Sequence, residues 1–264
     1  MCRWAAYRGP ELFLGEIVSA PAHSLVAQSH CAREAKSPTN GDGFGVAWYG
    51  ALPDPGLYRD ILPAWSDPNL KSICRQIRSR LFLAHVRAAT SGATSRANCH
   101  PFVHGRWSFM HNGQIGAWGA LRRPLEALLP DPLFAAREGS TDSELLFLLM
   151  LAEGLNDDPR GAVERTVRLV LAAAAARDVE PGLKLTAAFS DGRTLWAIRW
   201  ASEGEAPTLY AAGLGSGRCL MSEPFDHARG GWAEIPPASL VRLDDGGMVV
   251  RPFFPDARRL PLAG

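Results

Sequence analysis

Short apolar, β-rich runs alternate with polar breakers in the first half of the chain. Each run ends in turn-forming residues, such as Gly9-Pro10 or Gly41-Asp42-Gly43. Apolar runs of this length that are bounded by Gly, Pro and Asn are typical of β-strands. We therefore predict strands at residues 2–7, 45–49, 81–88 and 107–111.

The middle of the chain carries two helical patterns. Residues 145–155 are apolar nearly all round, which predicts a buried helix. Before them, Thr141-Asp142-Ser143-Glu144 has the form of a capped helix start, because Glu follows Thr by three residues. Residues 160–177 form an amphipathic pattern that ends in an alanine run.

Strand patterns return in the last third, as hairpins. The first hairpin pairs residues 184–190 with 194–200 around Asp191-Gly192, and the second turns at Asp245-Gly246-Gly247. The order strands, helices, strands predicts a layered α+β fold with antiparallel pairs and fits two stacked sheets with helices outside. The remaining strands of this region are predicted at residues 239–243, 248–252, 209–212 and 219–222.

Composition and charge exclude several classes of protein. The 264 residues are 47% hydrophobic with a net charge of +1, so a broad nucleic-acid surface is not indicated. The apolar runs are too short to span a bilayer. The N-terminus lacks a basic segment followed by an apolar core, so a secretory signal is not indicated. We expect a cytoplasmic protein that is not processed by a signal peptidase and has neither a nucleic-acid nor a membrane partner.

The five cysteines form no CxxC pair, and the spacings of His100, His104 and His111 match no common metal-ligand pattern. Reduced thiols and no metal are therefore expected. Cys2 is different, because it directly follows the initiator methionine. If Met1 is trimmed, Cys2 carries both a nucleophilic thiol and an amine with a pKa of about 7.7–8.0 that can act as its base.

Three further segments could carry chemistry. Arg87 at a strand end could bind a carboxylate, although alone it is interpreted better as a surface ion pair. Asn112 and Gly113 could supply the two donors of an oxyanion hole, although alone they predict a hairpin turn. Asp142 at a helix start could hold an ammonium group, or could serve in the cap.

Taken in order, these segments resemble the class II glutamine amidotransferase family over residues 2 to about 150. Ser222-Glu223-Pro224 followed by Trp232 is similar to small stand-alone members, namely bacterial glutamine amidotransferases of unassigned role and the γ-glutamyl hydrolase of ergothioneine biosynthesis. The matching segments are Cys2, Asn40-Gly41-Asp42-Gly43-Phe44-Gly45, His85-Val86-Arg87 through Thr90 and Gly92, Asn98 with His100-Pro101-Phe102, His111-Asn112-Gly113 and Thr141-Asp142-Ser143-Glu144.

The resemblance implies a four-layer αββα sandwich, the N-terminal nucleophile hydrolase fold, with no cofactor or metal. It also implies a role for each candidate residue. Aminosugar-synthesising relatives carry Trp and His where this chain has Ala88 and Ser91, so closure of the glutamine loop is expected to differ here. The implied roles are Cys2 as nucleophile with its α-amine as base, Asn112 and Gly113 as oxyanion hole, Arg87 with Thr90 on the substrate carboxylate, and Asp142 on the substrate ammonium.

A single domain over residues 2–264 is expected, with motifs in 2–150 and the remainder completing the sandwich. We therefore expect that no residues are left for an ammonia-accepting domain. The leading hypothesis is hydrolysis of a γ-glutamyl amide, with glutamine as default substrate, through a thioester on Cys2 that releases ammonia. The alternatives are hydrolysis of a γ-glutamyl thiol metabolite, and a glutamine-binding or conditional glutaminase subunit that needs a separate synthase partner.

Overall fold

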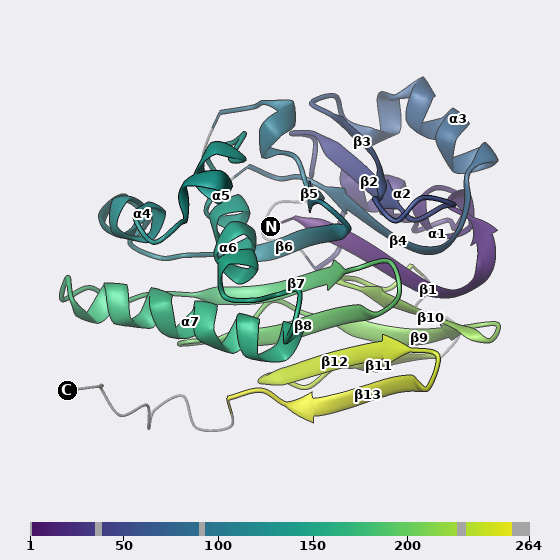
Figure 1. The fold of residues 1–264 in the computed structure, drawn as a ribbon. Coiled ribbons are helices and arrows are strands. Elements are labelled where there is room, and N and C mark those ends of the chain that lie inside the picture. Colours follow the sequence, from purple (N-terminus) through teal and green to yellow (C-terminus); the bar gives the residue numbers. More distant parts are fainter. Residues whose placement is uncertain (1, 35–38, 90–92, 226–230, 255–264) are drawn as a thin grey trace.

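Two stacked antiparallel sheets form the centre of the molecule (Figure 1), which the computed structural model describes over residues 2–34, 39–89, 93–225 and 231–254. The first sheet has the order β11 (Trp232–Glu234), β9 (Tyr210–Leu214), β10 (Gly217–Met221), β1 (Arg3–Phe13), β4 (Arg78–Val86), β2 (Phe44–Trp48) and β3 (Gly56–Asp60). The second has the order β13 (Gly247–Pro252), β12 (Ser239–Asp244), β8 (Leu195–Ala201), β7 (Lys184–Ser190), β6 (Trp107–Gln114) and β5 (Phe102–His104).

Helices cover the outer face of each sheet (Figure 1). The first sheet packs against α1 (Gly15–Val18), α2 (Leu25–His30) and α3 (Pro68–Gln76). The second packs against a larger group, which is α4 (Trp118–Glu126), α5 (Asp131–Ala135), α6 (Asp142–Ala152) and α7 (Pro159–Ala175). Short 3₁₀ turns occur at Ala64–Ser66 and Arg96–Asn98.

Side-chain alternation along the strands produces three apolar layers. On β1, Trp4 and Ala6 face the second sheet, whereas Ala5 and Tyr7 face the helices of the first. On β6, Met110 faces the space between the sheets. The helix-sheet-sheet-helix order confirms the predicted αββα sandwich.

The two predicted hairpins and the predicted buried helix are confirmed. β7 pairs with β8 and β12 with β13 across the expected turns. In α6, every residue from Ser143 to Met150 is buried, which explains why its sequence is apolar nearly all round. In the described part of the chain, no helix has the length and apolar character needed to cross a membrane.

Two turn predictions were wrong. β1 continues through Gly9-Pro10, and its pairing with β4 shifts register between Arg8 and Leu12, so the expected break is an irregularity within one strand. Asn112 and Gly113 lie inside β6, opposite Thr186 and Leu185 of β7. Residue 113 must be glycine because a Cβ there would lie 1.9 Å from the Lys184 carbonyl oxygen.

Candidate active site

Cys2 immediately precedes β1, in the middle of the first sheet. The thiol lies 3.6 Å from the carbonyl oxygen of Ala88, to which it can donate. By alternation with Trp4 and Ala6, its side chain belongs to the face that looks toward the second sheet. Burial raises the pKa of the Cys2 thiol, and the positive charges of Arg87 and Arg3 oppose that rise.

Arg87 follows β4, the strand next to β1, and is only 4% exposed. The surface position that the segment suggests when it is taken alone is therefore wrong. The loop before β2 holds the arginine backbone on both sides: Arg87 N donates to Gly43 O (2.8 Å), and Asp42 N donates to Arg87 O (3.0 Å). The Asp42 carboxylate also accepts from Ala89 N (2.7 Å), which fixes the chain just beyond the arginine.

Asn112 lies on β6, on the same face as Met110, and so faces the space between the sheets as Cys2 does. β6 contacts both β1 and β4 across this space. The Asn112 side chain is 2% exposed, and its Nδ2 has no hydrogen-bond partner in the described part of the chain. An unpaired buried donor is costly to retain, so such a group often marks a functional site.

Asp142 is the first residue of α6, and its carboxylate is attached to the end of β6. Oδ2 accepts from Ile115 N (2.7 Å) and Oδ1 accepts from Ser143 N (2.8 Å). Thr141 caps the helix as predicted, accepting from Glu144 N. The Glu144 carboxylate does not return to the cap but accepts from Glu138 N and Gly139 N, both at 2.8 Å.

Asn98 connects the segment that follows Arg87 to the segment that precedes Asp142. Its Nδ2 donates to Ala93 O (2.8 Å), in the segment that follows Arg87, and its Oδ1 accepts from Ser140 N (2.8 Å), just before Asp142. The sequence alone indicates no role for Asn98 or Asp42. Both residues lie within the segments that resemble the family, and that is the signal by which they could have been found. Thr90 lies outside the described residues.

Two buried imidazoles lie beside the arginine strand. The rings of His85 and His100 are 4.3 Å apart between centroids, and none of their nitrogens has a hydrogen-bond partner among the described residues. Burial lowers the pKa of His85 to about 3 and that of His100 well below its ordinary value. Among those residues, no group of three His, Cys, Asp or Glu side chains is arranged to hold a metal.

Acid is therefore expected to destabilise the fold through these histidines. Between pH 6.5 and 3, His85 binds a proton in the unfolded chain but not in the folded one, so stability falls as pH falls. From pH 7 to 4.5 the loss from His85 alone is about 2–3 kcal/mol. Urea unfolding at pH 7 and pH 4.5 gives the loss in free energy of unfolding for each protein. We expect this loss to be about 2–3 kcal/mol smaller in His85→Phe than in wild type. Equal losses in the two proteins would contradict this assignment.

A hollow in the surface lies away from these residues. It has a volume of about 590 Å³ and is lined by Arg8, Arg80, Arg193 and Arg218, together with Asp244 and Asp245. Arg8 is roughly 20 Å along β1 from Cys2 at the ordinary rise of a strand. The hollow includes none of the candidate site residues. The candidate site is the space between the sheets that Cys2 and Asn112 both face. The charge of Arg87 acts on Cys2 from the neighbouring strand, and Asp142 lies at the end of β6.

Comparison with known proteins identifies the family. Residues 16–206 match the family described as glutamine amidotransferases class-II. Probable glutamine amidotransferase DUG3 of Saccharomyces cerevisiae is 32% identical and aligns over 96% of this chain and 85% of its own. Gamma-glutamyl-hercynylcysteine sulfoxide hydrolase of Mycolicibacterium smegmatis is 31% identical, over 96% of this chain and 100% of its own.

A solved structure agrees with these relatives. The glutamine aminotransferase class-II domain protein from Silicibacter pomeroyi matches with a TM-score of 0.77 and 40% identity, over 96% of this chain and 99% of that chain. The two relatives and the solved structure therefore agree over nearly the whole length of the chain. The chain belongs to the class II glutamine amidotransferases and is an enzyme of that type.

Proposed function

We propose that this enzyme hydrolyses a γ-glutamyl amide, with glutamine as the default substrate, through a thioester on Cys2. The observation that carries the proposal is the buried, unpaired Nδ2 of Asn112 on the sheet that faces Cys2. A buried donor without a partner in the described part of the chain is available for the oxygen that becomes negative when a thiol attacks an amide carbon.

In the proposed reaction, the Cys2 sulfur forms a bond to the amide carbon while the thiol proton passes to the α-amine of Cys2. The amine then gives this proton to the leaving nitrogen, and ammonia departs as the C–N bond breaks. Water, deprotonated by the same amine, cleaves the thioester and releases glutamate. Because only a free amine can do this, the reaction requires removal of Met1. Asn112 Nδ2 and the Gly113 N–H stabilise the oxyanion in both steps.

Two charges of opposite sign would hold the amino-acid end of the substrate. Arg87 is a buried cation on the nucleophile's sheet and binds the α-carboxylate, with Thr90 assisting. Asp142 binds the α-ammonium. Its carboxylate accepts two backbone N–H groups, which leaves acceptor capacity for the substrate. Any γ-glutamyl compound presents the same two groups.

Hydrolysis of a γ-glutamyl compound that contains sulfur is a second candidate. Its support is the end-to-end match with gamma-glutamyl-hercynylcysteine sulfoxide hydrolase. A kcat/KM at least tenfold higher for a γ-glutamyl cysteine derivative than for glutamine would favour it. If a separate synthase subunit instead accepts the ammonia, turnover of glutamine by the isolated chain will be low and will rise when that subunit is added.

The first test is the intact mass of the purified protein before and after treatment with the glutamine analogue 6-diazo-5-oxo-norleucine. We expect a mass without methionine and one adduct per chain, absent from the Cys2→Ala variant. The analogue carries the α-amino acid end that the proposed anchors bind and an electrophilic carbon where the amide would be. Retained methionine, no adduct, or an adduct on the variant would each contradict the proposal.

A further inference from the structure

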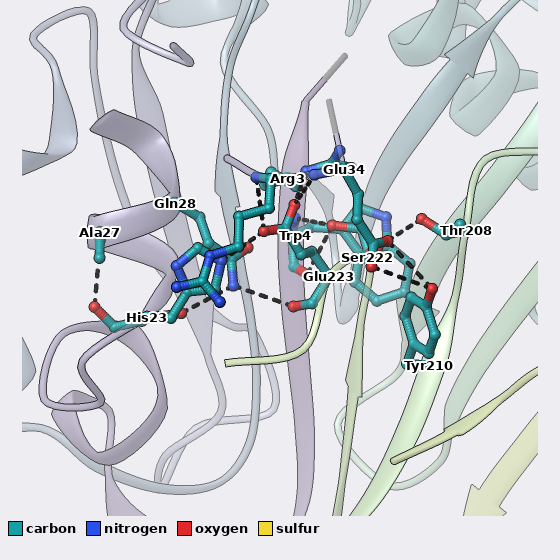
Figure 2. A network of polar contacts seen from close by, with 12 residues as sticks. Arg3, Trp4, His23, Ala27, Gln28, Glu34, Thr208, Tyr210, Ser222 and Glu223 are labelled. Atoms are coloured by element: carbon teal, nitrogen blue, oxygen red, sulfur yellow. Dashed lines mark hydrogen bonds and ion pairs between the residues drawn. The ribbon is translucent and has the colours of Figure 1, made fainter. Parts of the chain in front are cut away.

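A buried glutamate lies behind the strand that begins at the nucleophile. Glu223 follows β10, the neighbour of β1, and its side chain is fully buried. Figure 2 shows the polar contacts around it. Glu223 belongs to the Ser222-Glu223-Pro224 motif, to which the proposed chemistry gives no role. A carboxylate removed from water needs compensating partners, so its contacts indicate what it holds in place.

Glu223 joins three separate segments. Its Oε2 lies 3.0 Å from Arg3 Nε and accepts from Glu34 N (2.9 Å). Its Oε1 lies 2.5 Å from His23 Nε2 and accepts from Arg33 N (2.9 Å). Burial raises the pKa of Glu223, but these hydrogen bonds and the charge of Arg3 outweigh burial and lower it. The carboxylate therefore remains an anion between β1 and the loop after α2.

Arg3 connects Glu223 to Cys2. It is the next residue, it is fully buried, and its Nη1 donates to the Cys2 carbonyl oxygen (3.4 Å). Its side chain leaves β1 on the side of the helices, opposite to the face shared by Cys2 and Trp4. Ser222 adds a second contact, because its Oγ accepts from Trp4 N (2.9 Å) and its N donates to Trp4 O (3.1 Å).

We infer that Glu223 is a positioning residue for the nucleophile: through Arg3 it fixes the first residues of β1, so that the Cys2 thiol is held toward the site between the sheets. The inference rests on the proposed function of Cys2. A displacement of about 1 Å at a reacting group can cost about 10²-fold in rate. Loss of the carboxylate charge leaves the buried Arg3 guanidinium with only the weaker attraction of Glu34, and the start of β1 is expected to move so that water can reach it.

Glu223→Gln tests the inference, because it keeps the shape of the side chain and removes its charge. Two electrophiles are compared on the full-length protein from which Met1 has been removed. The adducts at Cys2 are measured by peptide mass. 6-Diazo-5-oxo-norleucine must use the substrate site, whereas iodoacetamide needs only an accessible thiol. We expect the rate constant to fall at least tenfold with the first and to rise at least threefold with the second, because the thiol leaves its half-buried position.

Unfolded chains would also react faster with iodoacetamide and lose the reaction with the glutamine analogue, so both rate constants are measured at a temperature at which thermal unfolding shows each variant to be fully folded. Asp60→Asn is the matched control. The Asp60 carboxylate is also buried, also accepts two backbone N–H groups (Ile61 and Leu62) and also pairs with an arginine, Arg96. Both rate constants of this control should stay within twofold of wild type.

Any other pattern in Glu223→Gln, including two unchanged or two lowered rate constants, would overturn the inference. If that variant does not fold, Arg3→Gln is combined with it, so that neither buried charge remains; the same opposite changes are expected and the same outcomes overturn the inference. If the wild-type Cys2 reacts with iodoacetamide but not with the glutamine analogue, the proposed function fails instead. In that case the iodoacetamide rate constant by itself tests the role of Glu223.

Discussion

Replacing Cys2 with Ala is expected to reduce glutamine hydrolysis by more than about 10⁴-fold, because no other group can form the thioester. Ala is small enough for Met1 still to be removed, so the variant differs from wild type only in the thiol. Cys2 is half-buried, and the free energy of unfolding should change by less than about 1 kcal/mol. Glutamate release and thermal unfolding measure the two effects.

Substrate binding should survive in this variant, because Arg87 and Asp142 are untouched. Isothermal titration with glutamine should therefore give a Kd within a few-fold of the wild-type KM. Cys2→Ser is the companion variant, since it keeps a weaker nucleophile of similar size at the same place and should retain a trace of turnover. Turnover by Cys2→Ala near the wild-type rate would rule out the thioester.

Local signals in the sequence are enough to predict the elements whose ends are defined by turn chemistry. The turn at Asp191-Gly192 ends β7, and the Thr141 cap begins α6 where the sequence places it. Elements without such signals were missed. β5 and β11 have three residues each, and β3 is only half-buried, so their pairing depends on neighbouring strands rather than on their own pattern.

Asn112-Gly113 shows how tertiary packing overrides a local preference. The dipeptide favours a hairpin turn, yet glycine is needed here because the Lys184 carbonyl and the His111 ring occupy the place of a Cβ. A sequence gives only the residue type; whether glycine serves a turn or a close approach of two strands depends on residue 184, some 70 positions away. The prediction of a turn at these two residues was therefore wrong, whereas their assignment to the candidate site stays a prediction.

The sequence shows the order of the candidate residues, but it does not show which side chains hold them in place. Asp42 bonds to residues more than 40 positions later in the chain, and Asn98 bonds to Ser140. Glu223 contacts Arg3 across 220 positions. Such partners have no periodicity that relates them, so only the fold reveals that these polar side chains hold the segments around Cys2 and Arg87.

Asn112→Ala is expected to lower kcat by about 10²–10³-fold with little change in KM, since an oxyanion-hole donor acts mainly in the transition state. The free energy of unfolding should respond differently. The variant removes a buried Nδ2 that has no partner in the described part of the chain, so the desolvation cost of that donor disappears and offsets the lost packing. Activity should therefore fall while the melting temperature stays close to that of wild type.

Asn98→Ala is the matched control for this separation. Asn98 is equally buried, at 2% exposure, but its Nδ2 donates to Ala93 O and Ser140 Oγ and its Oδ1 accepts from Ser140 N. Its removal takes a partner from each of these groups and should cost about 1–3 kcal/mol of stability. If Asn112→Ala loses as much stability as Asn98→Ala, or keeps kcat within tenfold of wild type, the Asn112 amide is a structural group and not an oxyanion donor. The contrast is informative because the described part of the chain satisfies the amide of Asn98 but supplies no partner for Nδ2 of Asn112.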